Sequence, residues 1–222
     1  MTALPEAARR DLVVLVADKN MEAVMVGLLG RPQSLNIRAI SFDVFVHPRR
    51  DPGCLTGADD FLRSFSSAYR CALVLFDHEG CGREQNSPES LATEVKARLE
   101  GVGWADRAEA VVLAPELEIW AWTDSPHVPR CLGWADRVPP LRQWLTEAGY
   151  WQTDETKPRQ PKVAFEAALR EVRKPRSSAI YGDLARSVSL KGHTEPTFLR
   201  LTRTLPAWFS EKTTRKSQTC HL

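Results

Sequence analysis

Long apolar runs are missing from this sequence. No stretch approaches the roughly 20 consecutive apolar residues that a membrane-crossing helix needs. The first segment, MTALPEAARRDLVVLVADKN, has a short apolar run that ends in acid and lysine. It lacks the long hydrophobic region and small-residue cleavage site of a signal peptide. We therefore expect a cytoplasmic protein that makes no membrane contact.

Cysteine is scarce, and no CxxC pair occurs. The five cysteines are Cys54, Cys71, Cys81, Cys131 and Cys220. An odd number of widely spaced cysteines, in a chain large enough to fold without disulfides, indicates reduced thiols. This agrees with a cytoplasmic location.

Several catalytic and nucleotide-binding motifs are also absent. The segment LGRPQS has neither the Lys-Ser pair of a P-loop nor the glycine spacing of a dinucleotide site. No nucleophile-elbow serine, helix-turn-helix or internal repeat is visible. A candidate site must therefore be sought among other polar residues.

The charge balance is nearly even but unevenly distributed. With 43% hydrophobic and 26% charged residues, the 222-residue chain fits one globular α/β core with a tail. The net charge is only +2, yet the last third contains the basic runs KPRQPK, REVRKPR and EKTTRKS. These runs fit either a polyanionic partner or a solvated helical surface.

Strand-like and helix-like patterns alternate through the first half of the chain. The apolar patterns predict strands at 11–17, 38–48, 71–77 and 108–115, and helices at 19–30, 57–70 and 87–100. Asp59 and Asp60 would lie in the first turn of the second helix. Such alternation predicts an α/β fold with a parallel four-stranded sheet flanked by helices, which binds ligands at the carboxyl ends of its strands.

The second half of the chain is predicted to be helical. We expect an α/β core over residues 1–125, a helical region packed on it over 126–210, and a frayed basic tail over 211–222. Five of the tryptophans after Pro115 could stack on nucleic-acid bases, but their apolar spacing favours the core. They are Trp120, Trp122, Trp134, Trp144 and Trp151.

Acidic residues follow three of the predicted strands. Asp18 and Glu22 follow the first, and Asp77 and Glu79 follow the third, with two glycines behind them that permit a sharp turn. The fourth strand runs into Glu116 and Glu118. Repelling carboxylates at one sheet edge need a neutralising cation, proton or arginine.

Clusters with only oxygen donors suit Mg²⁺ or Mn²⁺, which commonly serve in phosphodiester chemistry. Individual acids such as Glu22, Glu84 and Glu116 also fit a simpler interpretation, as exposed loop residues or charges near a helix N-terminus. Both interpretations stay open at this point.

Two of these segments resemble a known family. Asp18-Lys-Asn-Met-Glu22 and Asp77-His-Glu79-Gly-Cys-Gly82 are similar to the Toprim pattern, although Asp18, Lys19 and Glu79 stand where it usually has glutamate, glycine and aspartate. The resemblance extends to Toprim-like proteins of the DUF4276 type through Glu118-Ile-Trp120, Lys157, Lys162 and TEPTFLRLTRTL. The whole chain also looks like a small component of bacterial methylation-associated phage defence systems.

The resemblance implies a divalent-metal-dependent nuclease or phosphoesterase in antiviral defence, with nucleic acid and other defence subunits as partners. Asp18, Asp77 and Glu79 would hold one or two Mg²⁺ ions, with Glu22 and Glu118 as accessory ligands. The candidate phosphate-binding residues are Lys19, Arg49, Arg50, Arg83 and Lys162. The alternative is a catalytically inactive Toprim-like module that binds a partner protein or nucleic acid.

Two further alternatives concern the loops after the second and third strands. His47 with Cys54, and His78 with Cys81, could build a tetrahedral zinc site, although their spacing is loose. In the segment HPRRDPGC, Arg49 and Arg50 either contact phosphates or belong to a solvated turn.

Overall fold

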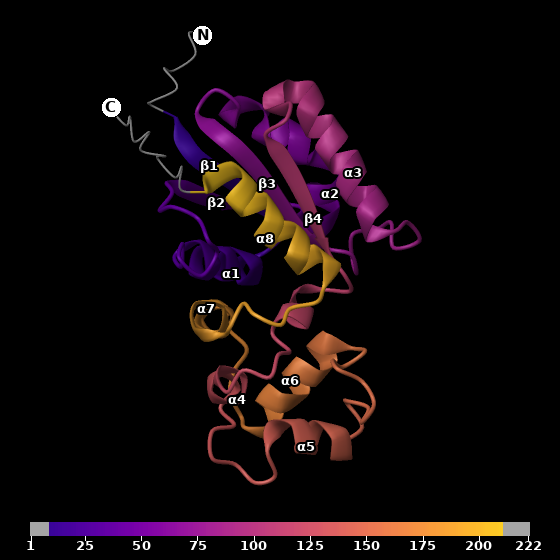
Figure 1. Ribbon diagram of the computed structural model, residues 1–222. Coiled ribbons are helices and arrows are strands. Elements are labelled where there is room, and N and C mark those ends of the chain that lie inside the picture. Colours follow the sequence, from indigo (N-terminus) through magenta and orange to yellow (C-terminus); the bar gives the residue numbers. More distant parts are fainter. Residues whose placement is uncertain (1–8, 211–222) are drawn as a thin grey trace, which may run out of the picture.

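The computed structural model describes residues 9–210 and contains one four-stranded, all-parallel sheet (Figure 1). The strand order is β2-β1-β3-β4. The strands are β1 (Arg10–Val16), β2 (Phe42–Val46), β3 (Tyr69–Asp77) and β4 (Ala108–Leu113). The predicted α/β sheet flanked by helices, with a helical second half, is confirmed. The expected tail at 211–222 lies outside the described residues.

The central strands are apolar because both faces of the sheet are covered. Residues Leu12 through Val16 of β1 are fully buried. Val16 pairs with Val46 on one side and Leu75 on the other, and Asp77 pairs with Leu113. This register brings the carboxyl ends of all four strands to one edge of the sheet.

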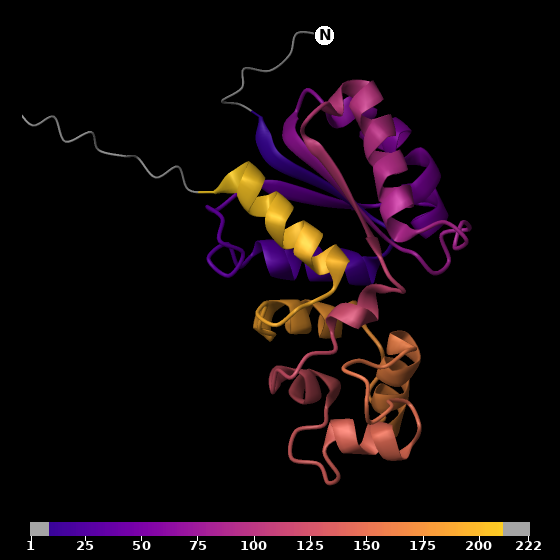
Figure 2. The ribbon, with the colours of Figure 1, turned by 45° about the vertical axis from the view of Figure 1, so that its right-hand side comes forward.

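Helices lie on both faces of the sheet (Figure 2). One face is covered by α1 (Lys19–Leu29) and α8 (Pro196–Phe209), and the other by α2 (Arg50–Leu62) and α3 (Pro88–Leu99). Short helical segments η2 (Arg63–Phe65) and η3 (Glu100–Trp104) lead into β3 and β4. α8 thus returns from the far end of the chain to pack beside β4.

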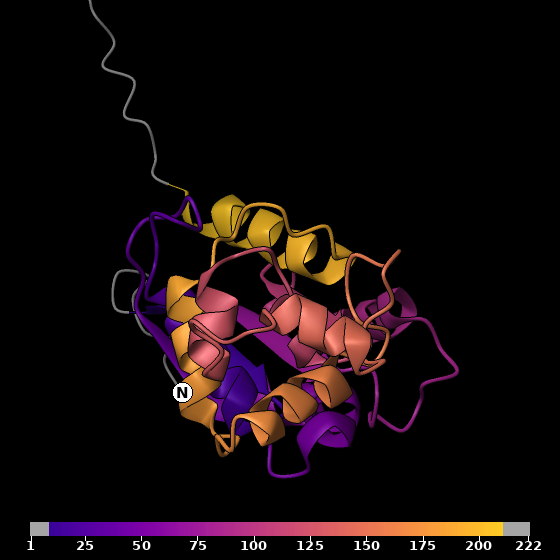
Figure 3. The same cartoon turned by 90° about the horizontal axis from the view of Figure 1, so that it is seen from below.

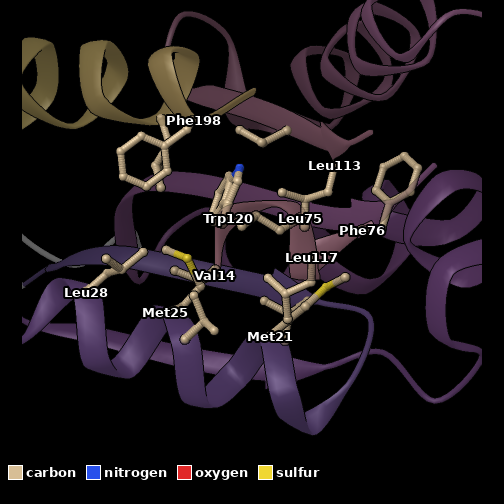
Figure 4. Close-up of a cluster of buried hydrophobic side chains, with 14 of the residues drawn as sticks. Val14, Met21, Met25, Leu28, Leu75, Phe76, Leu113, Leu117, Trp120 and Phe198 are labelled. Carbon is tan, nitrogen blue, oxygen red and sulfur yellow. The ribbon is translucent and has the colours of Figure 1, made fainter. Parts of the chain in front are cut away.

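The core between α1, α8 and the sheet is shown in Figure 4. Met25 of α1 lies near Val14 of β1 and Met21 lies beside Leu117, and both methionines are almost fully buried. Trp120 meets the ring of Phe198 edge-on, with centroids 5.1 Å apart. Burial of one such large apolar side chain contributes about 1.5–3 kcal/mol, so this cluster anchors α8 to the sheet.

Small residues allow α7 (Ser178–Ser187) to pack closely against α1. A Cβ atom on Gly27 would lie 2.7 Å from Cβ of Ala185 and 3.0 Å from the carbonyl oxygen of Gly182. Only a residue without a side chain fits at this contact. This contact lies in the last turn of α1, and at the first turn the Ser178 hydroxyl donates to Oδ1 of Asn20 at 3.1 Å, so the two helices run side by side.

The remaining helices lie beyond the carboxyl ends of the strands (Figure 3). They are η4 (Leu117–Trp120), α4 (His127–Leu132), α5 (Leu141–Glu147) and α6 (Pro161–Glu171). Four of the five tryptophans discussed above are buried, and Trp144 is partly buried, which confirms their core role. Within residues 9–210, no helix is long and apolar enough to cross a membrane.

The prediction of a helix over 57–70 was wrong at both ends. α2 begins at Arg50 and ends at Leu62, and Tyr69 already belongs to β3. Pro52 and Gly53 look like helix breakers in the sequence, but proline is well tolerated in the first turn of a helix. Asp59 and Asp60 therefore lie in the second half of α2, not in its first turn.

Candidate functional site

Asp18 lies directly after β1 and caps the N-terminus of α1. Its Oδ1 accepts hydrogen bonds from the backbone N–H groups of Asn20 and Met21, both at 2.9 Å. Aspartate is a favoured N-cap because it pairs N–H groups that have no partner within the helix. The other oxygen, Oδ2, has only a 3.4 Å contact with the Asn20 side chain. Capping therefore fixes the carboxylate in place and leaves Oδ2 lightly engaged.

Asp77 is the last residue of β3 and joins three elements at the sheet edge. Its Oδ1 accepts a 2.8 Å hydrogen bond from the backbone N–H of Leu117 in η4. Its own N–H donates to Oδ1 of Asp51, in the first turn of α2, at 2.8 Å. The loops after β2, β3 and β4 thus meet around one carboxylate.

The negative charges around Asp77 are only partly neutralised. Burial raises the pKa of Asp77 well above its ordinary value, and Asp51, Glu118, Glu116 and Asp18 raise it further. Burial also raises the pKa of Asp51, with a further contribution from Asp18. Acids that follow all four strands therefore influence one another, as expected at the carboxyl edge of a parallel sheet.

Glu116 caps the beginning of α6. Only 5% of it is exposed, and its Oε1 accepts a 3.0 Å hydrogen bond from the backbone N–H of Lys162. Its Oε2 lies 3.4 Å from Nζ of the same lysine. Burial and the neighbouring Glu118 raise the pKa of Glu116, and Lys162 opposes that rise.

Glu118 is neutralised more completely than its neighbours. It is 2% exposed, and its Oε1 accepts hydrogen bonds from the Tyr181 hydroxyl at 2.5 Å and from Arg176 at 2.8 Å. Arg176 also bonds Glu166 at 2.9 Å and donates to the Tyr181 oxygen at 2.7 Å. Burial and Glu118 raise the pKa of Tyr181, so its hydroxyl stays protonated.

Glu79 and Glu22 lie farther from this centre than the sequence suggested. Glu79 is exposed, and its backbone N–H donates to the carbonyl of Pro115 at 3.0 Å. Its charge influences Glu116 but is not among the main influences on Asp77. Glu22 forms a 2.6 Å ion pair with Lys19, on the exposed side of α1.

The predicted phosphate-binding residues are scattered. Arg83 is held by Glu94 through contacts of 2.8 and 2.9 Å. Arg49 and Arg50 are exposed, but they lie at the start of α2 and not only in a solvated turn. Lys162 is the member of the set that is coupled to the acids of the site. It lowers the pKa of Asp51, and Asp77 raises the pKa of Lys162.

The turn after Asp77 depends on its glycines. Gly80 and Gly82 have φ angles of +87° and +86°, which side-chain-bearing residues rarely adopt. Both of their N–H groups donate to Oε1 of Glu84, at 2.9 and 3.1 Å. The expected sharp turn is therefore present, and Glu84 stabilises the loop from within.

The residues suggested for zinc are engaged elsewhere. His47 is buried and accepts a 3.1 Å hydrogen bond from the backbone N–H of Arg49, and His78 contacts the carbonyl of Asn86 at 2.8 Å. Burial raises the pKa of the Cys54 and Cys81 thiols. Across residues 9–210, no three His, Cys, Asp or Glu side chains form a ready-made metal site.

Sequence reasoning missed Asp51, Arg176 and Tyr181. Asp51 could have been found, because it follows the second strand as Asp18 and Asp77 follow the first and third. Arg176 and Tyr181 had no such signal, since their link to Glu118 joins positions about 60 residues apart in the chain.

The fold and this edge define a class: an α/β protein with acids gathered at the carboxyl end of a parallel sheet. Comparison with known protein families, with curated proteins and with solved structures finds no match.

Proposed function

We propose that this chain is a cytoplasmic, divalent-metal-dependent nuclease or phosphoesterase that acts in antiviral defence on nucleic acid. The observation that carries the proposal is the unneutralised charge around Asp77, whose pKa is raised by burial and by four other carboxylates. A divalent cation relieves such repulsion. The Toprim resemblance of segments 18–22 and 77–82 supports the same chemistry, and it alone suggests the defence role and other defence subunits as partners.

The donor chemistry fits Mg²⁺ or Mn²⁺. Asp18, Asp51 and Asp77 do not form a ready-made ligand set, so side-chain rotations would have to bring them together around the ion. They would then hold it through carboxylate oxygens, which these hard cations prefer to sulfur or imidazole. Glu79, exposed on the neighbouring loop, would contribute less than the resemblance alone suggests. When bound, such an ion would polarise a phosphoryl oxygen and lower the pKa of a bound water.

The remaining charged side chain of the site would supply charge stabilisation. The ammonium of Lys162 would stabilise negative charge that develops on the phosphate.

A second candidate is a catalytically inactive Toprim-like module that binds a partner protein or nucleic acid. One observation favours it: Glu118 is already neutralised by Arg176 and Tyr181, and Glu116 by Lys162. A site whose acids were all neutralised by side chains of the same protein would need no metal ion.

Titration with Mg²⁺ and Mn²⁺ by calorimetry separates the two candidates. We expect the wild-type chain to bind the ions and Asp77→Asn to lose binding. Asp11→Asn is the control, because Asp11 lies at the opposite end of the same sheet. Metal binding should be followed by cleavage of single- and double-stranded DNA and RNA. Absence of both binding and cleavage in the wild type would favour the inactive module.

A further inference from the structure

The carboxyl edge of the sheet, called the acidic edge below, gathers Asp18, Asp51, Asp77, Glu116 and Glu118. It already contains a cation of its own, Lys162. This lysine follows Pro161 at the start of α6 and meets Glu116 through two different atoms. Its backbone N–H donates to Oε1 at 3.0 Å, while its ammonium lies 3.4 Å from Oε2. The two contacts are independent, because a side-chain rotation can break the second and leave the first intact.

Lys162 is held far more loosely than the other cation at this edge, Arg176. Arg176 has hydrogen-bonded contacts with Glu118, Glu166 and Tyr181, all between 2.7 and 2.9 Å. The Lys162 ammonium has one long contact, and 41% of its side chain is exposed. The Arg176 side chain is 33% exposed, so the contrast lies in the number of hydrogen bonds. A flexible lysine with one long contact can change partners at little cost, whereas a multiply bonded arginine cannot.

Departure of the ammonium would not leave Glu116 without a partner. Its Oε1 would keep the hydrogen bond from the Lys162 backbone, at the positive end of an 11-residue helix. Its Oε2 would then face the site without a cation. Although burial acts in the opposite direction, Glu116, Glu118 and Asp77 raise the pKa of Lys162, so the side chain stays charged at neutral pH.

We propose that Lys162 is an exchangeable counter-ion: its ammonium neutralises the acidic edge in the metal-free protein and turns to a phosphate group of the substrate when a divalent cation takes its place. This proposal rests on the proposed function, since it presupposes that the edge accepts a divalent cation. The reason is electrostatic, because a divalent cation and an ammonium repel each other when both approach the same carboxylates.

The test compares Lys162→Gln with the wild-type chain. Mg²⁺ and Mn²⁺ binding is measured by calorimetry, and inorganic phosphate binding is measured in the presence of saturating Mg²⁺. We expect Lys162→Gln to bind the metal about tenfold more tightly, because one competing charge is removed, and to bind phosphate about tenfold more weakly. Lys162→Arg keeps the charge and should restore phosphate binding.

A matched control is Lys96→Gln. Lys96 also faces a glutamate, at 3.8 Å from Glu109, but near the beginning of β4, away from the acidic edge. It should change neither affinity. Circular dichroism and thermal unfolding would confirm that each variant is folded.

The outcomes keep this proposal apart from the proposed function. Equal or weaker metal binding by Lys162→Gln, beside a wild type that binds, would overturn the exchange and leave the metal site standing. Binding by Lys162→Gln alone would also overturn the exchange, because the divalent cation would then fail to displace the ammonium of the wild-type chain. If neither chain binds at millimolar ion, both proposals are overturned.

Discussion

Asp11 at the amino end of the sheet and Asp77 at its carboxyl end are both aspartates on neighbouring central strands. Arg38 holds Asp11 through contacts of 2.5 and 3.0 Å, and Ser41 adds a backbone hydrogen bond at 2.9 Å. The hydrogen bond from Arg38 is the main reason that the pKa of Asp11 falls to about 2. At Asp77 burial raises the pKa, and the neighbouring acids raise it further.

The two aspartates differ in the main cause of the pKa shift, which is burial at Asp77 and the arginine partner at Asp11. At the amino end Asp43 likewise has Arg10 at 2.7 Å and the hydroxyl of Tyr69. Acids with arginine partners contribute to folding and need nothing further. Acids that surround one another weaken the fold at neutral pH unless they bind a proton or a cation. The carboxyl end is therefore the end suited to a ligand.

The largest expected effect is on metal binding. Asp77→Asn should weaken Mg²⁺ or Mn²⁺ binding by more than about 100-fold, beyond the range typical of residues that only support a ligand. The asparagine keeps Oδ1 and so can keep the hydrogen bond from Leu117. Calorimetry on folded protein measures the change. Wild-type affinity in this variant would remove Asp77 from the site.

Stability should respond to the same two aspartates with opposite signs. Asp11→Asn should lower the free energy of unfolding by about 1–2 kcal/mol at pH 7, because it removes the ion pair with Arg38. Asp77→Asn should raise it, because it removes a buried charge repelled by its neighbours. Urea unfolding at pH 7 measures both. A loss of stability in both variants would contradict the comparison.

The contributions of Asp11 and Asp77 to stability should change with pH in opposite directions. The folded pKa of Asp11 is about 2, below its ordinary value of 3.8, so its contribution is complete above the ordinary value and is lost as the pH falls through 2. The folded pKa of Asp77 is raised, so the native state holds the proton more tightly and loses stability as the pH rises above 3.8. The stabilising effect of Asp77→Asn should therefore grow with pH.

The choice of ligands can be sharpened with a smaller expected difference. Asp51→Asn should weaken metal binding about tenfold, whereas Glu79→Gln should change it less than about threefold. Asp51 bonds the Asp77 backbone and acts on its charge, while Glu79 is exposed. Mn²⁺ titration followed by electron paramagnetic resonance would rank the two. The reverse order would restore the ligand set that the resemblance suggests.

Local patterns explain why much of the sheet could be predicted. The uninterrupted apolar run in β1 and the aspartate that follows it identify a buried strand and a helix cap from adjacent residues. The start of α2 could not be placed because Pro52 and Gly53 also favour a turn. This one error concealed Asp51, since a residue assigned to a loop was not counted among the strand-end acids.

The cationic side of the site depends on contacts between distant segments. Lys162 meets Glu116 across 46 positions, and Arg176 meets Glu118 across 58. Periodicity within a segment contains no information about such pairs. The sequence therefore indicated where the acids gather, but only the packing of α6 and α7 shows which of them are already neutralised.

The smallest expected effect concerns Tyr181. Its hydroxyl and Arg176 both donate to Glu118, so this acid has partners within the chain, as the acids at the amino end of the sheet do. Tyr181→Phe removes the hydroxyl that donates to Glu118 and keeps the ring stacked on Phe165, with centroids 5.1 Å apart. Since Arg176 still bonds Glu118, we expect a loss of only about 1 kcal/mol in the free energy of unfolding.

Metal affinity should stay near the wild-type value, because Glu118 remains paired with arginine. Calorimetry and urea unfolding test the two expectations separately. A large change in metal affinity would show that Glu118 belongs with Asp77 as a ligand, and the division between neutralised and unneutralised acids would then fall elsewhere.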